Sequence, residues 1–322
     1  MTDAPAGRSG GRGLHAFAVL LVLWTFALLS VGGVVTGKEA GLSVPDWPLS
    51  YGTVNPPGWT ETPNVFEEHL HRLLGWGAGI LVLLLLTWLE LRDPRPWMRR
   101  LGWVVLAAVC VQGVIGGYFR VVLLQHGMAV VHGVTGQAFF CLVVAVALFL
   151  SKGWLEAPPP EADPRARRLR LLSLAAAAAV FLQVVLGALV RHSRAGHEFL
   201  ILLPHAAWGI ACALLAFMAM AEALRLGGKG PALARPALLL GAGTLIQILL
   251  GLGAYLANVE GVREIVRPGY QVAATTVHQA AGALVLASAV VLHLRVRRLL
   301  RDPDAEPAAA RSAAAVPAGG AA

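Results

Sequence analysis

EEHLHRLLGW, residues 67–76, opens a strongly apolar run. The stretch places two carboxylates, two imidazoles and a guanidinium where a membrane helix would begin, and ionisable groups at such depth are costly enough to mark functional sites. His71 is followed four positions later by Gly75. The same His-x-x-x-Gly spacing opens three further apolar segments, at His132, His205 and His278. This repetition indicates that one structural unit recurs along the chain.

The His-x-x-x-Gly spacing has a physical meaning on a helix. Residues i and i+4 share one face, so the glycine removes a side chain that would otherwise stand beside the imidazole. A flat macrocycle could then lie against the backbone. His192 and Gly196 also fit the pattern, but they lie in a polar stretch. Position near the start of an apolar segment therefore separates the four histidines from this fifth match.

The apolar residues fall into runs that are too long for a soluble core. The 322-residue chain is 57% hydrophobic and 14% charged, and none of its runs alternates like a barrel strand. Each run approaches the ~20 residues that cross a bilayer. The sequence therefore predicts an all-α integral membrane protein, multi-pass in the cell (cytoplasmic) membrane, with a retained first helix. The eight expected transmembrane helices are 14–36, 70–91, 101–120, 127–150, 170–190, 199–224, 235–257 and 270–294.

The net charge of +8 is explained by the way the basic residues are divided between the two sides of the membrane. Most of the basic residues fall in alternate segments, and cytoplasmic segments are the ones that carry excess Lys and Arg. We therefore expect both termini in the cytoplasm and no nucleic-acid partner; the contacts expected around the spans are with membrane lipid. The basic residues left for the outer side are Lys38, Arg72, Arg120, Arg191, Arg194, Arg263 and Arg267.

The chain resembles itself on either side of a proline-containing connection. Gln112, Gln183 and Gln247 are each followed four positions later by glycine, and Leu28 stands before Gly32 at the same spacing. Because His-x-x-x-Gly opens every second span, we predict two tandem pseudo-symmetric four-helix bundles. The expected parts are a disordered cytoplasmic tail (1–13), an N-terminal half (14–151) with an outer capping loop (37–69), a cytoplasmic linker (152–169), a C-terminal half (170–295) and a low-complexity cytoplasmic tail (296–322).

Four histidines near the outer ends of the even-numbered spans are the strongest candidate ligands. Imidazole is a common axial ligand of haem iron, and helical bundles build cofactor sites from facing helices. Two histidines in each half are enough to hold one iron from both sides. A single intramembrane histidine is more often a packing residue, but four in equivalent places favour ligation: His71, His132, His205 and His278.

Glu68 makes the two halves differ. It precedes His71 by three positions and so shares its helix face. The residues at the equivalent positions, Ala129, Leu202 and Thr275, do not ionise. Only the first half therefore has a candidate acid–base group. A carboxylate favoured by the positive end of a helix is the alternative explanation for Glu68.

Other polar residues carry weaker signals. Arg72, Arg120 and Arg191 could pair with the propionates of a bound haem, although interfacial arginines often only reach toward water. The outer loop that contains Asp46 and Trp47 is either a cap over a site or an interfacial belt. We expect no disulfide among Cys110, Cys141 and Cys212. The remaining histidines are expected to be ordinary solvated residues; they are His15, His69, His126, His192, His197 and His293.

Three features together resemble haem A synthase. They are GLSVPDWP at residues 41–48, Glu68-x-x-His71-Arg72, and a histidine that opens each even helix of eight. The resemblance covers most of residues 14–295. It implies that haem O is oxidised at its C8 methyl group to a formyl group, giving haem A for terminal oxidases. It identifies neither the electron acceptor nor the source of the formyl oxygen, and it leaves open whether a haem O synthase docks to the chain.

The resemblance also implies roles for single residues. His205 and His278 would ligate a resident haem b, His71 and His132 would line the haem O site, and Glu68 would be the catalytic carboxylate. Many members of the family carry a cysteine pair around the Pro-Asp-Trp-Pro motif. Val44 and Ser50 occupy those places here, so no mechanism that needs this thiol pair can operate in this chain.

Two other classes of protein remain as alternatives. A di-haem b membrane cytochrome that passes electrons between quinone and a partner would explain the four histidines, but it gives no reason for a carboxylate in one half alone. A transporter built from repeats would be expected to carry broken helices and charges at mid-membrane.

Overall fold

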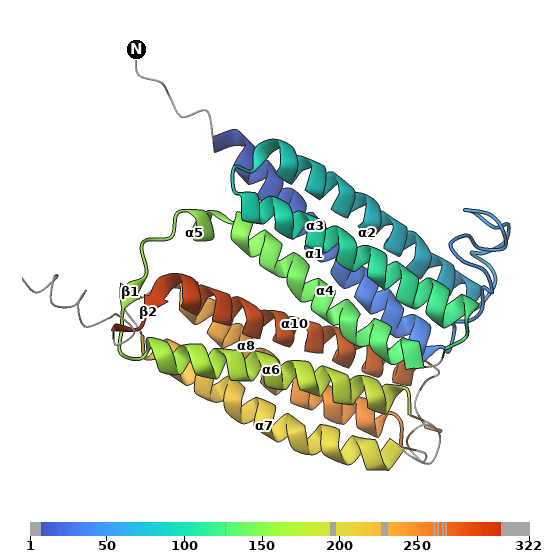
Figure 1. Ribbon diagram of the computed structural model, residues 1–322. Coiled ribbons are helices and arrows are strands. Elements are labelled where there is room, and N and C mark those ends of the chain that lie inside the picture. The colour runs from blue at the N-terminus through green and yellow to red at the C-terminus, as the bar shows by residue number, and fades with distance from the viewer. Residues whose placement is uncertain are drawn as a thin grey trace, which may run out of the picture.

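The computed structural model describes residues 8–125, 127–193, 198–226, 231–259, 262, 264–265, 267 and 269–303. Among these residues, eight helical segments are long and apolar enough to cross a membrane. They lie side by side along a common direction (Figure 1). The predicted class, an all-α integral membrane protein with eight spans, is confirmed. The side of the membrane on which the termini lie stays a prediction.

The first group of helices contains four spans. They are α1 (Arg8–Gly37), α2 (Val65–Arg92), α3 (Pro96–Gly113) with its continuation as a π-helix, η1 (Val114–Val122), and α4 (Gly127–Leu150). Residues 38–64, which we call the outer loop, join α1 to α2 and lie at one end of the group (Figure 1). Residues 65–69 of the expected capping loop therefore belong to α2.

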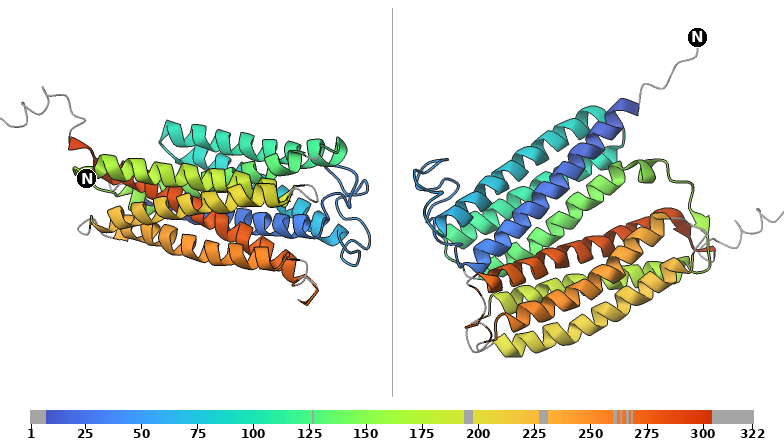
Figure 2. Two further views of the ribbon diagram at one scale, coloured as in Figure 1. Left: turned by 90° about the horizontal axis from the view of Figure 1, so that it is seen from below. Right: turned by 180° about the vertical axis from the view of Figure 1, so that it is seen from behind.

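The second group follows a short connection. The connection holds α5 (Lys152–Leu155) and the two-residue strand β1 (Glu161–Ala162). The spans are α6 (Ala166–Arg191), α7 (Glu198–Leu224), α8 (Pro231–Leu256) and α10 (Tyr270–Leu299), and β2 (Leu300–Arg301) follows directly. Within each group the helices contact their neighbours, and α10 also contacts α1 and α4 of the first group (Figure 2).

Both expected tails are shorter than predicted. Residues 8–13 belong to α1, and Gly13 lies against the ring of Trp88. Residues 296–301 belong to α10 and β2, and β2 pairs in parallel with β1. Arg298 donates hydrogen bonds to the carbonyl oxygens of Ala157 and Pro158, which fastens the end of α10 to the linker. Residues 1–7 and 304–322 lie outside the described residues.

Small residues bring the helices close together, as is common in membranes. Several alanines in the helix interfaces are completely buried, among them Ala176, Ala216, Ala237 and Ala289. Large apolar side chains instead cover the outside of the bundle, for example Leu83, Leu214 and Ile246. Lipid tails solvate such side chains as well as a protein core does, so an apolar exterior is the expected result of membrane insertion.

Candidate functional site

Two pairs of histidine rings face each other between helices. His71 from α2 and His132 from α4 have ring centroids 6.2 Å apart and planes at 86°. His205 from α7 and His278 from α10 have centroids 6.3 Å apart and planes at 79°. The four histidines that the sequence singled out are thus brought together as two pairs, one in each group of helices.

The separation of the rings fits a metal ion held between two imidazoles. A metal–imidazole bond of about 2.0–2.1 Å accounts, taken twice, for about 4 Å of each centroid separation. About 2 Å of each separation remains, which leaves about 1 Å from each ring centre to its ligating nitrogen. Within the described part of the chain, the buried Nδ1 atoms of His71, His132 and His205 also have no hydrogen-bond partner. Each pair therefore fits axial ligation of one haem iron.

Each of the four rings lies against a glycine of the preceding helix, where a side chain would leave no room. The distances from a hypothetical glycine Cβ to the histidine Cε1 are 3.0 Å for Gly32 and His71, 2.6 Å for Gly116 and His132, 3.1 Å for Gly187 and His205, and 2.9 Å for Gly251 and His278. The glycines that precede the histidine helices therefore set how closely the rings approach the backbone.

A backbone carbonyl group lies beside each imidazole as well, although it forms no hydrogen bond with the Nδ1 atoms of His71, His132 and His205. It belongs to the residue four positions before the glycine, namely Leu28, Gln112, Gln183 and Gln247 for the four histidines in chain order. Histidines that bind metal commonly donate their second ring N–H to a backbone carbonyl or carboxylate, which fixes the tautomer and the ring orientation. The same arrangement is available at all four positions.

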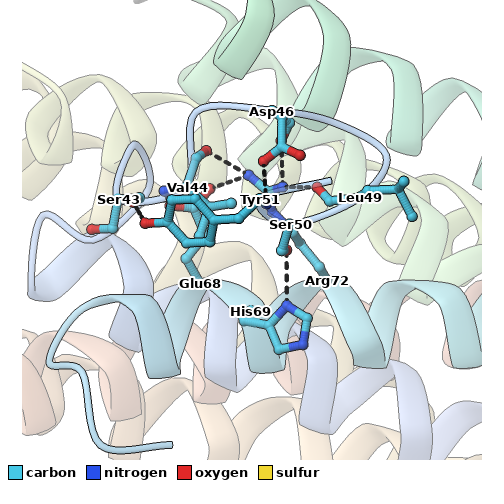
Figure 3. Close-up of polar contacts among 9 residues, drawn as sticks. All are labelled: Ser43, Val44, Asp46, Leu49, Ser50, Tyr51, Glu68, His69 and Arg72. Atoms are coloured by element: carbon cyan, nitrogen blue, oxygen red, sulfur yellow. Dashed lines mark hydrogen bonds and ion pairs between the residues drawn. The ribbon is translucent and has the colours of Figure 1, made fainter. Parts of the chain in front are cut away.

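Glu68 joins α2 to the outer loop (Figure 3). Its side chain is buried, its Oε1 pairs with Nη2 of Arg72 at 2.6 Å, and its Oε2 accepts the N–H of Val44 at 2.9 Å. Arg72 donates further hydrogen bonds to the carbonyl oxygens of Val44, Asp46 and Leu49. Most donors of Arg72 are therefore occupied within the chain. Arg72 thereby holds the outer loop, and its pairing with a haem propionate stays a prediction.

The outer loop has a fixed conformation of its own. Asp46 accepts the backbone N–H groups of Tyr51 and Gly52 at 2.7 and 2.8 Å. Burial raises the pKa of Asp46, but the backbone N–H groups of Gly52, Tyr51 and Asp46 together with the charge of Arg72 outweigh it, so the net pKa lies below the ordinary value. The ring of Trp47 packs against Gly117 of η1, where a Cβ would clash with it. The loop is thus attached to both α2 and η1, which supports an ordered cap.

His69 was expected to be a solvated interface residue, and this was wrong. It is 2% exposed, its Nδ1 lies 2.8 Å from the hydroxyl oxygen of Ser50, and its ring packs edge-on against Trp59. The sequence holds a weak signal for this, since His69 points away from His71 and toward the loop that follows α1. The hydroxyl group of Ser50 therefore has the ring of His69 as its hydrogen-bond partner.

The other polar candidates lie in different surroundings. Arg120 has a buried Nη1 atom with no partner among the described residues, so it keeps the capacity to bind a carboxylate. Arg191 is exposed at the end of α6. Burial lowers the pKa of His192, and the charges of Arg191 and Arg120 lower it further. His126, Arg194, His197 and Arg263 lie outside the described residues.

Two more histidines expected to be solvated have protein partners instead. His15 Nδ1 lies 3.0 Å from the carbonyl oxygen of Ala147, and His293 Nδ1 lies 3.1 Å from the hydroxyl oxygen of Ser173. Each contact joins two helices. Near the ends of closely packed helices, a buried acceptor from a neighbouring helix replaces water as the imidazole's partner. The three cysteines form no disulfide, as expected.

Comparisons with known proteins agree with this geometry. A protein of Rhizorhabdus wittichii named Heme A synthase is 25% identical over an alignment that covers 88% of this chain and 94% of the relative. Proteins of the same name from Methylobacterium nodulans and Methylobacterium sp. (strain 4-46) are each 32% identical. Those two matches cover 55% and 58% of the relatives, so in them the similarity spans little more than half of the relative's length.

The family model described as cytochrome oxidase assembly protein matches residues 15–200, which is more than half of the chain. The match begins in α1 and runs to the start of α7, so it includes the outer loop, Glu68 and the first histidine pair. The chain belongs to the cytochrome oxidase assembly protein family.

Proposed function

We propose that this protein is a haem A synthase of the cell membrane that oxidises the C8 methyl group of haem O to a formyl group. The observation that carries the proposal is that the histidines form two pairs, with the two rings of each pair facing each other. Only the first pair has a carboxylate one turn away on the same helix. The names of the relatives support it. An enzyme that converts one haem with the help of another needs two haem sites of different chemistry.

The two sites are assigned by this difference. We assign His205 and His278 as the residues that would hold the iron of a resident haem b, which would supply one-electron transfer away from the substrate when bound. We assign His71 and His132 to the substrate, haem O. The ring of His71 rests on Gly32, and this contact orients the imidazole toward His132.

Glu68 is the group assigned to proton transfer. Conversion of a methyl to a formyl group removes four electrons, and protons must leave the carbon as it is oxidised. Glu68 precedes His71 by one helical turn. Its Oε1 and Oε2 are held by Arg72 and by the backbone of Val44, so the carboxylate has a fixed position under the outer loop. The loop would at the same time restrict access of water to the site.

The test is extraction and chromatography of haems from cells that make haem O, with and without this protein. We expect haem A only in cells that contain the intact protein. Glu68→Gln should abolish haem A while the purified protein keeps its haem b spectrum. Glu67→Gln is the matched control, because Glu67 is the neighbouring carboxylate on α2 and pairs with Lys38 instead.

Two results would overturn the proposal. Bound haem b without any conversion of haem O, in cells with a working electron acceptor, would identify the protein as a di-haem cytochrome. Full haem A production by Glu68→Gln would remove the assigned role of the carboxylate.

A further inference from the structure

The helices that carry the second histidine pair are joined by reciprocal contacts. On α6 and α7, the side-chain amide of Gln183 donates to the backbone carbonyl of His205 at 2.9 Å. The amide fits because Gly209 has no side chain: a Cβ there would lie 3.3 Å from Gln183 Nε2. In return, the ring of His205 occupies the room left by Gly187. Each helix thus receives one side chain of the other.

The same reciprocal contact joins α8 and α10. Gln247 Nε2 donates to the backbone carbonyl of His278 at 2.9 Å, and a Cβ at Gly282 would lie 3.1 Å from this nitrogen. The ring of His278 lies against Gly251. His205 and His278 are therefore each held at two points: the ring packs against a glycine, and the backbone carbonyl accepts a glutamine hydrogen bond.

The contact is weaker at the helix that carries His132. Gln112 is present, but its amide donates to the hydroxyl oxygen of Thr135 at 2.7 Å instead of to a backbone carbonyl of α4. A Cβ at Gly136 would lie 3.6 Å from Gln112 Oε1, which is an ordinary contact distance. The side chain of Gln112 therefore restrains α4 without fixing the carbonyl of His132.

The hydrogen bond from a glutamine is missing at the helix that carries His71. Leu28 occupies the glutamine position of α1 and has no donor. Among the described residues, no atom would lie within 4 Å of a Cβ at Gly75, so the space that a glutamine fills in the other repeats is open. Trp24 joins α1 to α2 one turn further on, where its indole donates to the carbonyl of Leu74 at 2.8 Å.

We propose that Gln183 and Gln247 are positioning residues that retain the resident haem, whereas Leu28 leaves the backbone of His71 without this contact from α1 and so favours release of the haem held there. The inference rests on the proposed function, because it explains how one site holds its haem while the other exchanges haem O for haem A. An enzyme that converts a haem must release it. Glu68, His69 and Arg72 hold the first turns of α2 to the outer loop, but among the described residues no hydrogen bond from α1 reaches the backbone carbonyl of His71, so α1 and α2 separate at this ligand at lower cost. Leu28 and Gly75 are thus determinants of product release.

The test is haem transfer from the full-length purified protein, loaded with haem O, to an excess of apomyoglobin. Chromatography of the transferred haem distinguishes haem O from haem b. We expect haem O to leave at least about tenfold faster than haem b, the effect of roughly one buried hydrogen bond. Leu28→Gln should slow the release of haem O about tenfold, and Leu28→Met, which adds no donor, should not.

The second histidine pair supplies the opposite test. Gln247→Leu and Gln183→Leu should each speed the release of haem b about tenfold. A positioning role also predicts a shift in the low-spin electron paramagnetic resonance signal of haem b in both variants, because the imidazole planes are no longer held. A purely structural role would lower the yield of protein without moving this signal.

Three outcomes overturn the inference: equal release of the two haems, unchanged release of haem O from Leu28→Gln, or unchanged release of haem b from Gln247→Leu. If Leu28→Gln does not fold, the Gln247→Leu measurement decides alone. The proposed function fails in a different way, since haem O would then bind and leave as stated while no haem A forms in cells.

Discussion

Arg72 illustrates how much a single buried side chain can connect. Its guanidinium reaches Glu68 on its own helix and three carbonyl oxygens of the outer loop. The planar fork of arginine suits several acceptors at once, whereas lysine is a point charge on a flexible stem. The residue therefore ties the candidate catalytic carboxylate and the loop into one unit.

We expect Arg72→Lys to destabilise the protein by about 1–3 kcal/mol, because hydrogen bonds to buried acceptors are lost. Thermal unfolding measures the effect, and proteolysis within residues 38–64 should speed up. Arg99→Lys is the control, since Arg99 and Glu90 form an exposed pair at 4.0 Å, worth at most about 1 kcal/mol. Equal effects of the two substitutions would contradict the anchoring role of Arg72.

Asp46 makes the outer loop sensitive to acid. Its pKa is lower in the folded loop than the ordinary value of 3.8, so the stabilisation that it provides is present above that value. The stabilisation is lost as the pH falls through 3.8 and then through the lower pKa of the folded state. We expect hydrogen exchange at the amides of Tyr51 and Gly52 to gain protection between acidic and neutral pH, beyond the intrinsic dependence. Asp46→Asn should abolish this extra change.

His69 and His71 show what a residue pattern can and cannot predict. The repeated spacing of the ligand histidines was visible because it recurs four times, and the structure brings those histidines together. The buried site of His69 depends on Ser50 and Trp59, which lie far away in the sequence. Such long-range contacts leave no periodic signal.

At the scale of the elements, apolar length was sufficient to predict all eight spans. Their ends were less predictable, because contacts between elements occur there: Gly13 of α1 lies against Trp88, and Arg298 near the end of α10 bonds to the linker. The conformation of the outer loop could not be predicted at all. It is fixed by Arg72 of α2 and by the glycine of η1 on which Trp47 rests.

We expect Gly251→Ala to weaken haem b binding, because the new Cβ would lie 2.9 Å from His278 Cε1. Overpacking of this kind costs about 1–3 kcal/mol, which corresponds to about tenfold or more in haem affinity. Gly253→Ala on the same helix is the control, since no described atom lies within 4 Å of a Cβ there. Titration of the haem-depleted protein with haem measures both. Unchanged affinity in Gly251→Ala would contradict the close packing of the ring.

At the scale of the whole molecule, the charge pattern predicts that the outer loop and the linker face opposite sides of the membrane. We expect a cysteine introduced as Asn55→Cys to react with a membrane-impermeant maleimide on right-side-out vesicles. Glu156→Cys should react only after permeabilisation. Both positions are exposed. The background is a variant with alanine at Cys110, Cys141 and Cys212, and the reverse labelling pattern would invert the topology.

The place of α10 in the fold also bears on how the protein is made. This last span contacts α1 and α4 as well as α6 and α8, and it carries His278. Its continuation β2 closes onto β1 in the middle of the chain. During synthesis the first seven spans therefore leave the ribosome before the helix that joins the two groups. The second histidine pair, and with it any resident haem, can be completed only after α10 has been inserted, so cofactor loading reports that the two groups of helices have been joined.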